Sequence, residues 1–303
     1  MSGILAVALL AAIPLFGPSK YVMHILILVL LNVVLGQSWN LLGGFAGQIS
    51  FGHAAMYGIG AYTSTLLYLH LGLSPWIGMF FGGMLAAFYA TLLGTITFRL
   101  RGPYFALATL ATAEVVRLIA QNWDTFTGGD DGLSIHLEIA PRVVEYFIIL
   151  AIVTAVISVI YFISVSRIGY YLSAIREDEE ASRAIGIDVT RYKVITLAIS
   201  AFFAGIGGSF FASYQLYFNP YVVLTVHTSL QMIFISIVGG MGTIIGPIIG
   251  AFLLVPIAEI FRVISPSANL LIYGLVIVLV MRFMPEGVAG LGKKLFKSER
   301  KTG

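Results

Sequence analysis

Long apolar runs dominate the sequence, and they limit the folds that the chain can adopt. Most of the runs contain 16 to 23 residues, which suits α-helices that cross a hydrocarbon core of about 30 Å. Apolar and polar residues do not alternate within them, as they would in the strands of a membrane barrel. Only 10% of the 303 residues are charged, whereas a typical soluble domain has about 25%. The sequence therefore predicts an all-α integral membrane protein.

About ten segments are assigned as membrane-spanning, and together they predict a polytopic helical bundle. The segments are 4–17, 21–41, 50–70, 76–98, 103–120, 143–165, 194–213, 222–238, 246–263 and 269–284. The first is short enough to lie at the membrane interface instead. No soluble domain fits between the segments. We therefore expect one transmembrane domain over residues 1–290, followed by a basic tail at 291–303.

The positions of Lys and Arg predict the orientation of the chain. With the N-terminus inside, 13 of the 17 Lys and Arg residues fall in inside loops and the tail. Cytoplasmic loops are enriched in these residues, so we expect a multi-pass protein with both termini in the cytoplasm. The tail "KKLFKSERK" would then lie near anionic lipid headgroups. We interpret it as the solvated end of the last segment.

Several kinds of chemistry find no support in the sequence. The chain has no Cys, which excludes disulfides, thiolate metal sites and a Cys nucleophile. His24, His53 and His227 stand alone in apolar runs, without the spacing of metal ligands, so we expect no metal site. The basic residues lie in loops and a tail, so the net charge of +3 gives no reason to expect a nucleic acid partner.

The most informative connection is "SRIGYYLSAIREDEEASRAIGIDVTRYK", residues 166–193. From Leu172 to Ile185 it contains no Gly or Pro, and its residues step at helical spacing. Gly186 follows as a helix stop. We predict a short amphipathic helix under the membrane. Its dense charges of both signs and its face of small residues favour docking into a groove of a soluble partner over an ordinary solvated loop helix.

A Gly-rich stretch, "GGFAGQISFGHAAMYGIGAY" at 43–62, interrupts the apolar pattern. Backbone groups cannot remain unpaired in lipid, so a break there must line a cavity or pack against protein. We predict a broken entry into the third helix over residues 43–60, with Gly58, Gly60 and Ala61 as small faces for close helix packing. Gly239–Gly246, ahead of Pro247, is the expected counterpart.

Three roles remain open for these two breaks. Transporters often place substrate beside interrupted helices. Both breaks fall on the cytoplasmic side of the predicted topology, which suits an inner gate equally well. The third alternative is a plain cytoplasmic turn with small packing residues. The candidate residues for a substrate path or gate are Gly44, Gly47, Gln48, Ser50, His53, Tyr57, Gly240 and Gly242.

Two acid–base pairs fall inside predicted segments. Glu114 and Arg117 are three residues apart on one helix face, and so are Glu259 and Arg262. An unpaired charge is costly in a bilayer, so such residues usually pair or face a cavity. We interpret them as local ion pairs near the outer ends of their helices. The alternative is that they form an outer vestibule or receive a binding protein.

Three motifs carry a resemblance to a known family. "EASRAIG", Glu180–Gly186, resembles the E-A-A-x-x-x-G loop that membrane subunits of ATP-binding cassette (ABC) importers present to their ATPases, with Ser182 in place of the second Ala. The wider "AIREDEEASRAIGI", "NLLGGFAGQISFGHAAMYGIGAY" (40–62) and "SIVGGMGTIIGPIIGAF" (236–252) resemble permeases of branched-chain (hydrophobic) amino acid importers, specifically the second of two paralogous permeases. The resemblance covers about residues 30–290.

The resemblance implies a multisubunit importer in the bacterial cytoplasmic (inner) membrane. An extracytoplasmic binding protein would deliver the amino acid, this chain and a paralogous permease would form the path, and two ATPase subunits would switch access. The chain has no P-loop motif, so ATP and Mg²⁺ would be bound by the partners and the chain itself would be neither an enzyme nor cofactor-dependent. The implied ATPase-coupling residues are Arg176, Glu177, Glu180, Ala181, Arg183 and Gly186.

Three functions are alternatives to a permease for branched-chain amino acids. A permease of the same family for urea or short amides fits the same motifs. A self-sufficient secondary transporter or channel would leave the 166–193 loop without a purpose. An intramembrane enzyme would need a nucleophile–base set or metal ligands inside the bundle, and no such spacing is present in the sequence.

Overall fold

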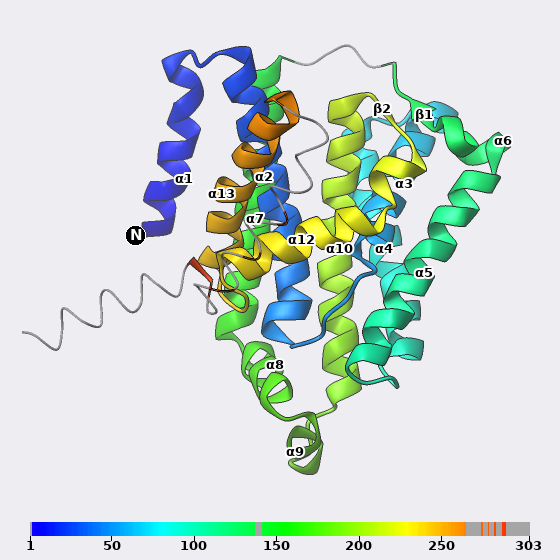
Figure 1. Cartoon of the computed structure of the whole chain (residues 1–303), viewed down its shortest axis with the longest axis vertical. Helices are drawn as coiled ribbons and strands as arrows, with labels where there is room; N and C mark the ends of the chain where they lie inside the picture. Colours follow the sequence, from blue (N-terminus) through cyan, green and yellow to red (C-terminus); the bar gives the residue numbers. More distant parts are fainter. Residues whose placement is uncertain are drawn as a thin grey trace, which may run out of the picture. The chain divides into compact units, whose positions relative to one another are not determined.

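The fold is described by a computed structural model, in which the chain is mainly α-helical (Figure 1). The described residues are 2–136 and 141–264, with the isolated positions Gly274, Val278, Arg282, Gly287 and Val288. The tail at 291–303 and most of the tenth predicted segment lie outside these residues.

The described helices follow the predicted segments to within a few residues. The longer ones are α1 (Ser2–Ala12), α2 (Lys20–Asn40), α3 (His53–Leu71), α4 (Pro75–Thr97), α5 (Pro103–Asn122), α7 (Arg142–Val165), α10 (Val189–Gln215), α12 (Val226–Gly239) and α13 (Ile245–Ile264). The shorter ones are α6 (Asp124–Thr127), α8 (Arg167–Glu177), α9 (Glu179–Ala184) and α11 (Pro220–Val223), with 3-10 turns at Ile13–Phe16 and Gly129–Asp131. Two short antiparallel strands, β1 (Leu133–Ser134) and β2 (Tyr217–Phe218), pair Leu133 with Phe218.

Within the described residues, six helical segments are long and apolar enough to cross a membrane, which confirms a multi-pass helical protein. They are Lys20–Phe45, Pro75–Thr97, Pro103–Asn122, Arg142–Val165, Val189–Gln215 and Pro220–Gly239. The apolar part of α13 is shorter. The 19 residues of α3 include Tyr, His, Ser and Thr, which lower its mean hydropathy. The count of about ten spanning segments stays a prediction.

The helices group into two compact units. We call Met1–Gln37, Ile139–Val159 and Phe234–Gly303 the terminal unit, and Ser38–Glu138 with Ile160–Ile233 the central unit. The central unit contains both the loop at residues 166–193 and the first Gly-rich stretch, residues 43–62.

Close helix contacts form the core of the central unit. A Cβ on Gly60 of α3 would lie 2.0 Å from the carbonyl oxygen of Gly205 of α10, and one on Gly208 would lie 1.8 Å from the carbonyl oxygen of Tyr57. The backbones of α3 and α10 therefore touch, which only Gly allows at these positions. The hydroxyl of Ser209 also donates to the Gly60 carbonyl at 2.8 Å. The predicted packing role of Gly60 is confirmed.

Candidate functional site

The loop at residues 166–193 folds into two helices rather than one. α8 ends at Glu177, and α9 begins at Glu179. Between them Asp178 is extended, and its Oδ1 accepts hydrogen bonds from the backbone N–H groups of Glu180 and Ala181 at 2.8 and 3.0 Å. Asp178 is thus an N-cap. The single amphipathic helix predicted from Leu172 to Ile185 is wrong at this position.

The helix stop at Gly186 is confirmed. Gly186 has a φ of +90°, which favours glycine, and its N–H donates to the carbonyl of Arg183 at 3.0 Å. In Figure 1, α9 lies below the N-terminal end of α10.

The α8–α9 segment, residues 167–184, buries one face and exposes the other. Leu172, Ile175 and Ser182 are buried. The predicted coupling residues all lie on the exposed face: Arg176, Glu177, Glu180, Ala181, Arg183 and Gly186. Ile185 beside them is 76% exposed, which adds an apolar contact to a charged surface. This arrangement suits docking of a soluble partner.

Charge pairs fasten α9 to its neighbours. The Glu179 carboxylate accepts from the buried Lys193 Nζ at 2.5 Å and from Arg183 at 2.7 Å. Burial by itself would raise the pKa of Glu179, but the hydrogen bond from Lys193 and the charges of Lys193 and Arg183 outweigh it, so the pKa lies below its ordinary value. Glu180 pairs with Arg101, in the turn between α4 and α5, at 2.5 Å.

One side chain of α8 reaches the first Gly-rich stretch. Arg176 Nη1 donates to the carbonyl oxygen of Gly44 at 3.0 Å. Gly47 has a φ of +70°, and a Cβ there would lie 2.8 Å from Arg176 Cγ. The side chain of Arg176 therefore lies against both glycines. Arg176 is a predicted coupling residue, and Gly44 and Gly47 are predicted gate residues, so this contact joins the two predicted sites.

The predicted break before the third helix is present and is shorter than expected. α2 continues into a π-helical turn at Leu41–Phe45, and α3 begins at His53. Residues 46–52 between them are irregular, and we call them the first break. Ala46, Ser50 and Gly52 within it are buried, and their backbone polar groups require partners.

A buried network joins the first break to α2 and α10. Ser38 and Ser200 each donate their hydroxyl to the other's backbone carbonyl, both at 2.6 Å. Ser200 can then only accept from His53 Nε2, at 2.8 Å. His53 Nδ1 lies 3.3 Å from Ser50 Oγ, and the indole N–H of Trp39 donates to the Ser50 carbonyl at 2.8 Å.

Two further helices, α5 and α12, also bond to the first break and the start of α3. The N–H of Phe51 donates to Thr109 Oγ1 of α5 at 3.1 Å, and the N–H of Ala54 donates to Ser229 Oγ of α12 at 2.9 Å. Side chains from four helices thus satisfy the first break and the start of α3. This packing fits the requirement for irregular backbone at membrane depth.

The predicted path residues fall into two groups. Ser50 and His53 are fully buried, and Tyr57 is 4% exposed with its ring 5.7 Å from that of Phe211. Gly47 is exposed and Gln48 is half-buried. In this conformation Gly47 and Gln48 are the more accessible, and a gate or substrate role for any of these residues stays a prediction.

The second break is a tight turn in the terminal unit. α12 ends at Gly239 and α13 begins at Ile245. Gly240 and Gly242 have φ values of +126° and +77°, and a Cβ on Gly239 would lie 1.8 Å from the carbonyl oxygen of Gly246. The predicted break is present here, and the roles left open for it, as a gate, a substrate contact or a plain packing turn, stay predictions.

One of the two predicted intramembrane ion pairs is present. Arg117 Nε donates to Glu114 at 2.9 Å, and Arg117 Nη1 donates to Gln121 at 2.8 Å. Glu259 is 8% exposed. The side chain of Arg262 lies outside the described part of the chain, so the second pair is not tested.

Sequence reasoning missed the residues that anchor these elements. Ser200 and Thr109 are small polar residues within apolar helices, a pattern that also occurs in ordinary helix packing. Lys193 gave a stronger signal, because a Lys near the start of an apolar helix is expected to pair when it is buried. Its partner Glu179 lies within the same loop motif.

Replacing Ser200 by Ala is expected to destabilise the central unit. The substitution removes the acceptor for His53 and the donor to the Ser38 carbonyl, and unpaired buried groups cost about 1–3 kcal/mol each. Thermal unfolding in detergent should show a clear loss of stability. Ser213→Ala is the control, because the Ser213 hydroxyl only donates to its own helix at Ser209. Equal melting temperatures for Ser200→Ala and the wild type would contradict the network.

The contact of α9 with Lys193 is expected to depend on pH. Since folding lowers the Glu179 pKa, the pair stabilises the fold fully above the ordinary value of 4.5 and is lost as the pH falls through the lowered pKa. The protection factors of the α9 amides, which correct for the intrinsic pH dependence of exchange, should therefore be low at neutral pH in Glu179→Gln but low only in acid in the wild type. Glu177→Gln, with an exposed side chain, should match the wild type. Strong protection of α9 at neutral pH in Glu179→Gln would refute the stabilising role of the Glu179–Lys193 pair.

Comparisons with known proteins agree with this architecture. Residues 21–281 match the family described as branched-chain amino acid transport system / permease component. The high-affinity branched-chain amino acid transport system permease protein LivM of Escherichia coli K12 is 31% identical, over 97% of this chain and 76% of LivM. The permease protein LivH of the same organism is 24% identical, over 86% of this chain and 93% of LivH.

A solved structure shares the fold. PsaBC from Streptococcus pneumoniae in complex with Fab matches with a TM-score of 0.51 and 15% identity, over 90% of this chain and 95% of the matched chain. That identity supports the fold alone. The match over residues 21–281, together with the similarity to LivM, establishes that the chain belongs to the family of permease components of branched-chain amino acid ABC transporters.

Proposed function

We propose that this chain is one of two paralogous permeases of an importer for branched-chain amino acids in the bacterial cytoplasmic membrane. An extracytoplasmic binding protein delivers the amino acid, and two ATPase subunits supply the energy. Similarity to both LivM and LivH supports a paired arrangement, and the higher identity with LivM supports the second permease as this chain's counterpart.

The contact of Arg176 with Gly44 carries the coupling part of the proposal. The exposed face of the α8–α9 segment receives the ATPases, and Arg176 joins that segment to the first break. A displacement of α8 on nucleotide binding would pull on the carbonyl of Gly44 and on the backbone at Gly47. The first break then acts as part of the inner gate. ATP is cytoplasmic, so the α8–α9 segment lies on that side.

Purification of the tagged chain from its native membrane tests the subunit composition. We expect mass spectrometry to find a second permease and P-loop ATPases with it. Recovery of the chain alone, with uptake activity that needs no ATP, would contradict the proposal and favour a secondary transporter or channel.

Arg176→Met is expected to reduce amino acid uptake strongly while the subunits still assemble. Methionine keeps the apolar stem beside Gly47 but removes the donor to the Gly44 carbonyl. Uptake into proteoliposomes and recovery of the ATPases should be measured together. Arg167→Met is the matched control, because Arg167 is an exposed residue of the same helix. Normal uptake by Arg176→Met would refute a coupling role.

The double substitution Glu180→Lys with Gly186→Pro is expected to uncouple transport without unfolding the bundle. Proline cannot adopt the φ of +90° at residue 186 and lacks the N–H that bonds Arg183. Lysine at residue 180 repels Arg101. The bundle should remain folded, because these changes lie in the α8–α9 segment and its contact with Arg101, but ATP-driven uptake should be lost. Asp131→Lys, a charge reversal at an exposed residue far along the sequence, should transport normally. Normal uptake by the double variant would contradict the proposal that the ATPases dock on the α8–α9 segment.

A further inference from the structure

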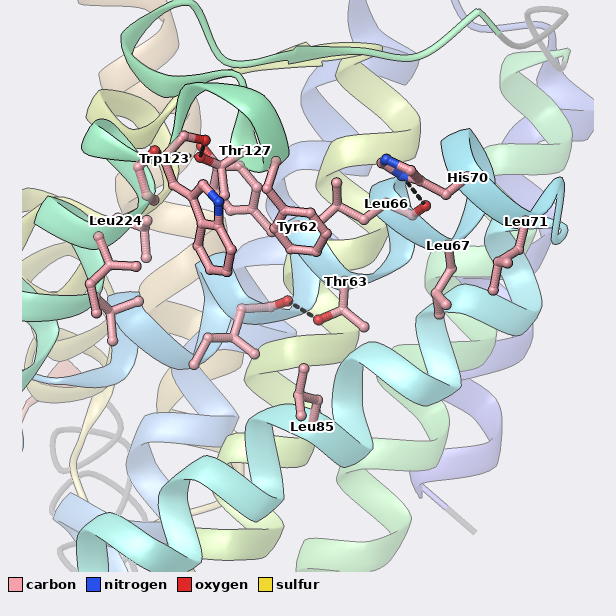
Figure 2. A pocket seen from close by; sticks show the side chains of 15 residues that line it. Tyr62, Thr63, Leu66, Leu67, His70, Leu71, Leu85, Trp123, Thr127 and Leu224 are labelled. Carbon is pink, nitrogen blue, oxygen red and sulfur yellow. Dashed lines mark hydrogen bonds between the residues drawn. The ribbon is translucent and has the colours of Figure 1, made fainter.

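An apolar cavity lies in the central unit, away from the first break. Its volume is about 530 Å³, which is within the range of ligand pockets. Residues of α3, α4, α5 and α6, with Leu224, line it (Figure 2). We propose that this cavity binds one acyl chain of a membrane phospholipid. The proposal requires only that the protein lies in a membrane.

The walls favour a hydrocarbon chain over a free amino acid. Of the described residues that line the cavity, none is Asp, Glu, Lys or Arg. The hydroxyls of Thr63 and Thr127 are already used, since they donate to the carbonyls of Ile59 and Ala120 at 2.6 Å each. The ammonium group of an amino acid would therefore find no carboxylate among these described residues, and the burial of an unpaired charge is costly. A methylene chain has no such cost.

The cavity opens onto surfaces that face lipid. Leu85 of α4 is 47% exposed and Ile119 of α5 is 52% exposed, and both helices are long and apolar enough to span a membrane. Trp123 directly follows α5 and is 51% exposed. Tryptophan is enriched at the membrane–water interface. A lipid whose headgroup lies near Trp123 would therefore direct its chain along α5 toward Leu85.

One polar group in the wall lacks a partner. The Tyr62 side chain lines the cavity and is 6% exposed, and its hydroxyl has no hydrogen-bond acceptor among the described residues. Buried hydroxyls usually have partners. The ester carbonyl at the head of a phospholipid chain is an acceptor of the right kind, because it sits where apolar chain meets polar headgroup. Because that hydroxyl is itself shielded, an ester carbonyl reaches it only when the ring turns toward the cavity, and Tyr62→Phe tests this contact.

Photolabelling in lipid bilayers tests the site. The full chain, with any subunits that co-purify, is reconstituted with phosphatidylcholine carrying a diazirine in one acyl chain, and adducts are mapped by mass spectrometry. We expect adducts concentrated on α3 and α5 around Thr63 and Ile119. Thr63→Trp fills the cavity. Excluding even two methylenes corresponds to about a tenfold loss of occupancy, and the adduct yield should fall by that factor.

Controls separate the site from general lipid contact. Leu92→Trp changes an exposed residue of α4 outside the cavity and should leave the yield unchanged. Val116→Trp is a second filling variant if Thr63→Trp does not fold. Tyr62→Phe should lower the yield less than either filling variant. Adducts spread evenly over all helices, adducts displaced by free leucine, or loss of adducts when a second permease binds would each overturn the proposal.

Discussion

The requirement that every backbone polar group in a membrane be paired governs this structure. The first break interrupts an apolar bundle with seven irregular residues, 46–52. Trp39, Thr109, Ser200 and Ser229 approach it and the start of α3 from four different helices. These helices must keep their register for the break to remain satisfied. A change at the break is therefore costly unless the surrounding helices change with it.

The α8–α9 segment has the contacts needed to impose such a change. The pair of Glu179 with Lys193 holds α9 against α10, and Asp178 caps α9 where α8 ends. Arg176 then joins α8 to Gly44, which precedes the break, and lies against Gly47 within it. The apolar cavity is lined by other residues of the same unit, so the proposed binding of an acyl chain and the contact of Arg176 with Gly44 are separable by mutation.

The sequence allowed much of this arrangement to be predicted. The apolar runs predicted the helices, because burial in lipid requires long uninterrupted segments, and the Gly-rich stretches at 43–62 and 239–246 predicted both interruptions. The residues predicted to couple to ATPases are exposed in the structure, and their coupling role stays a prediction. Helical spacing missed the division at Asp178, because a carboxylate looks like a solvated surface charge until its capping bonds are seen. The pairing of His53 with Ser200 joins residues 147 positions apart, and local pattern carries no information about such contacts.

Hydrogen exchange at the first break is the most direct test of the coupling account. The assembled transporter would be compared with and without a non-hydrolysable ATP analogue, in the wild type, in Arg176→Met and in Arg167→Met. The account predicts that nucleotide changes exchange at residues 46–52 in the wild type and in Arg167→Met but not in Arg176→Met. The same nucleotide-dependent change in all three proteins would contradict it.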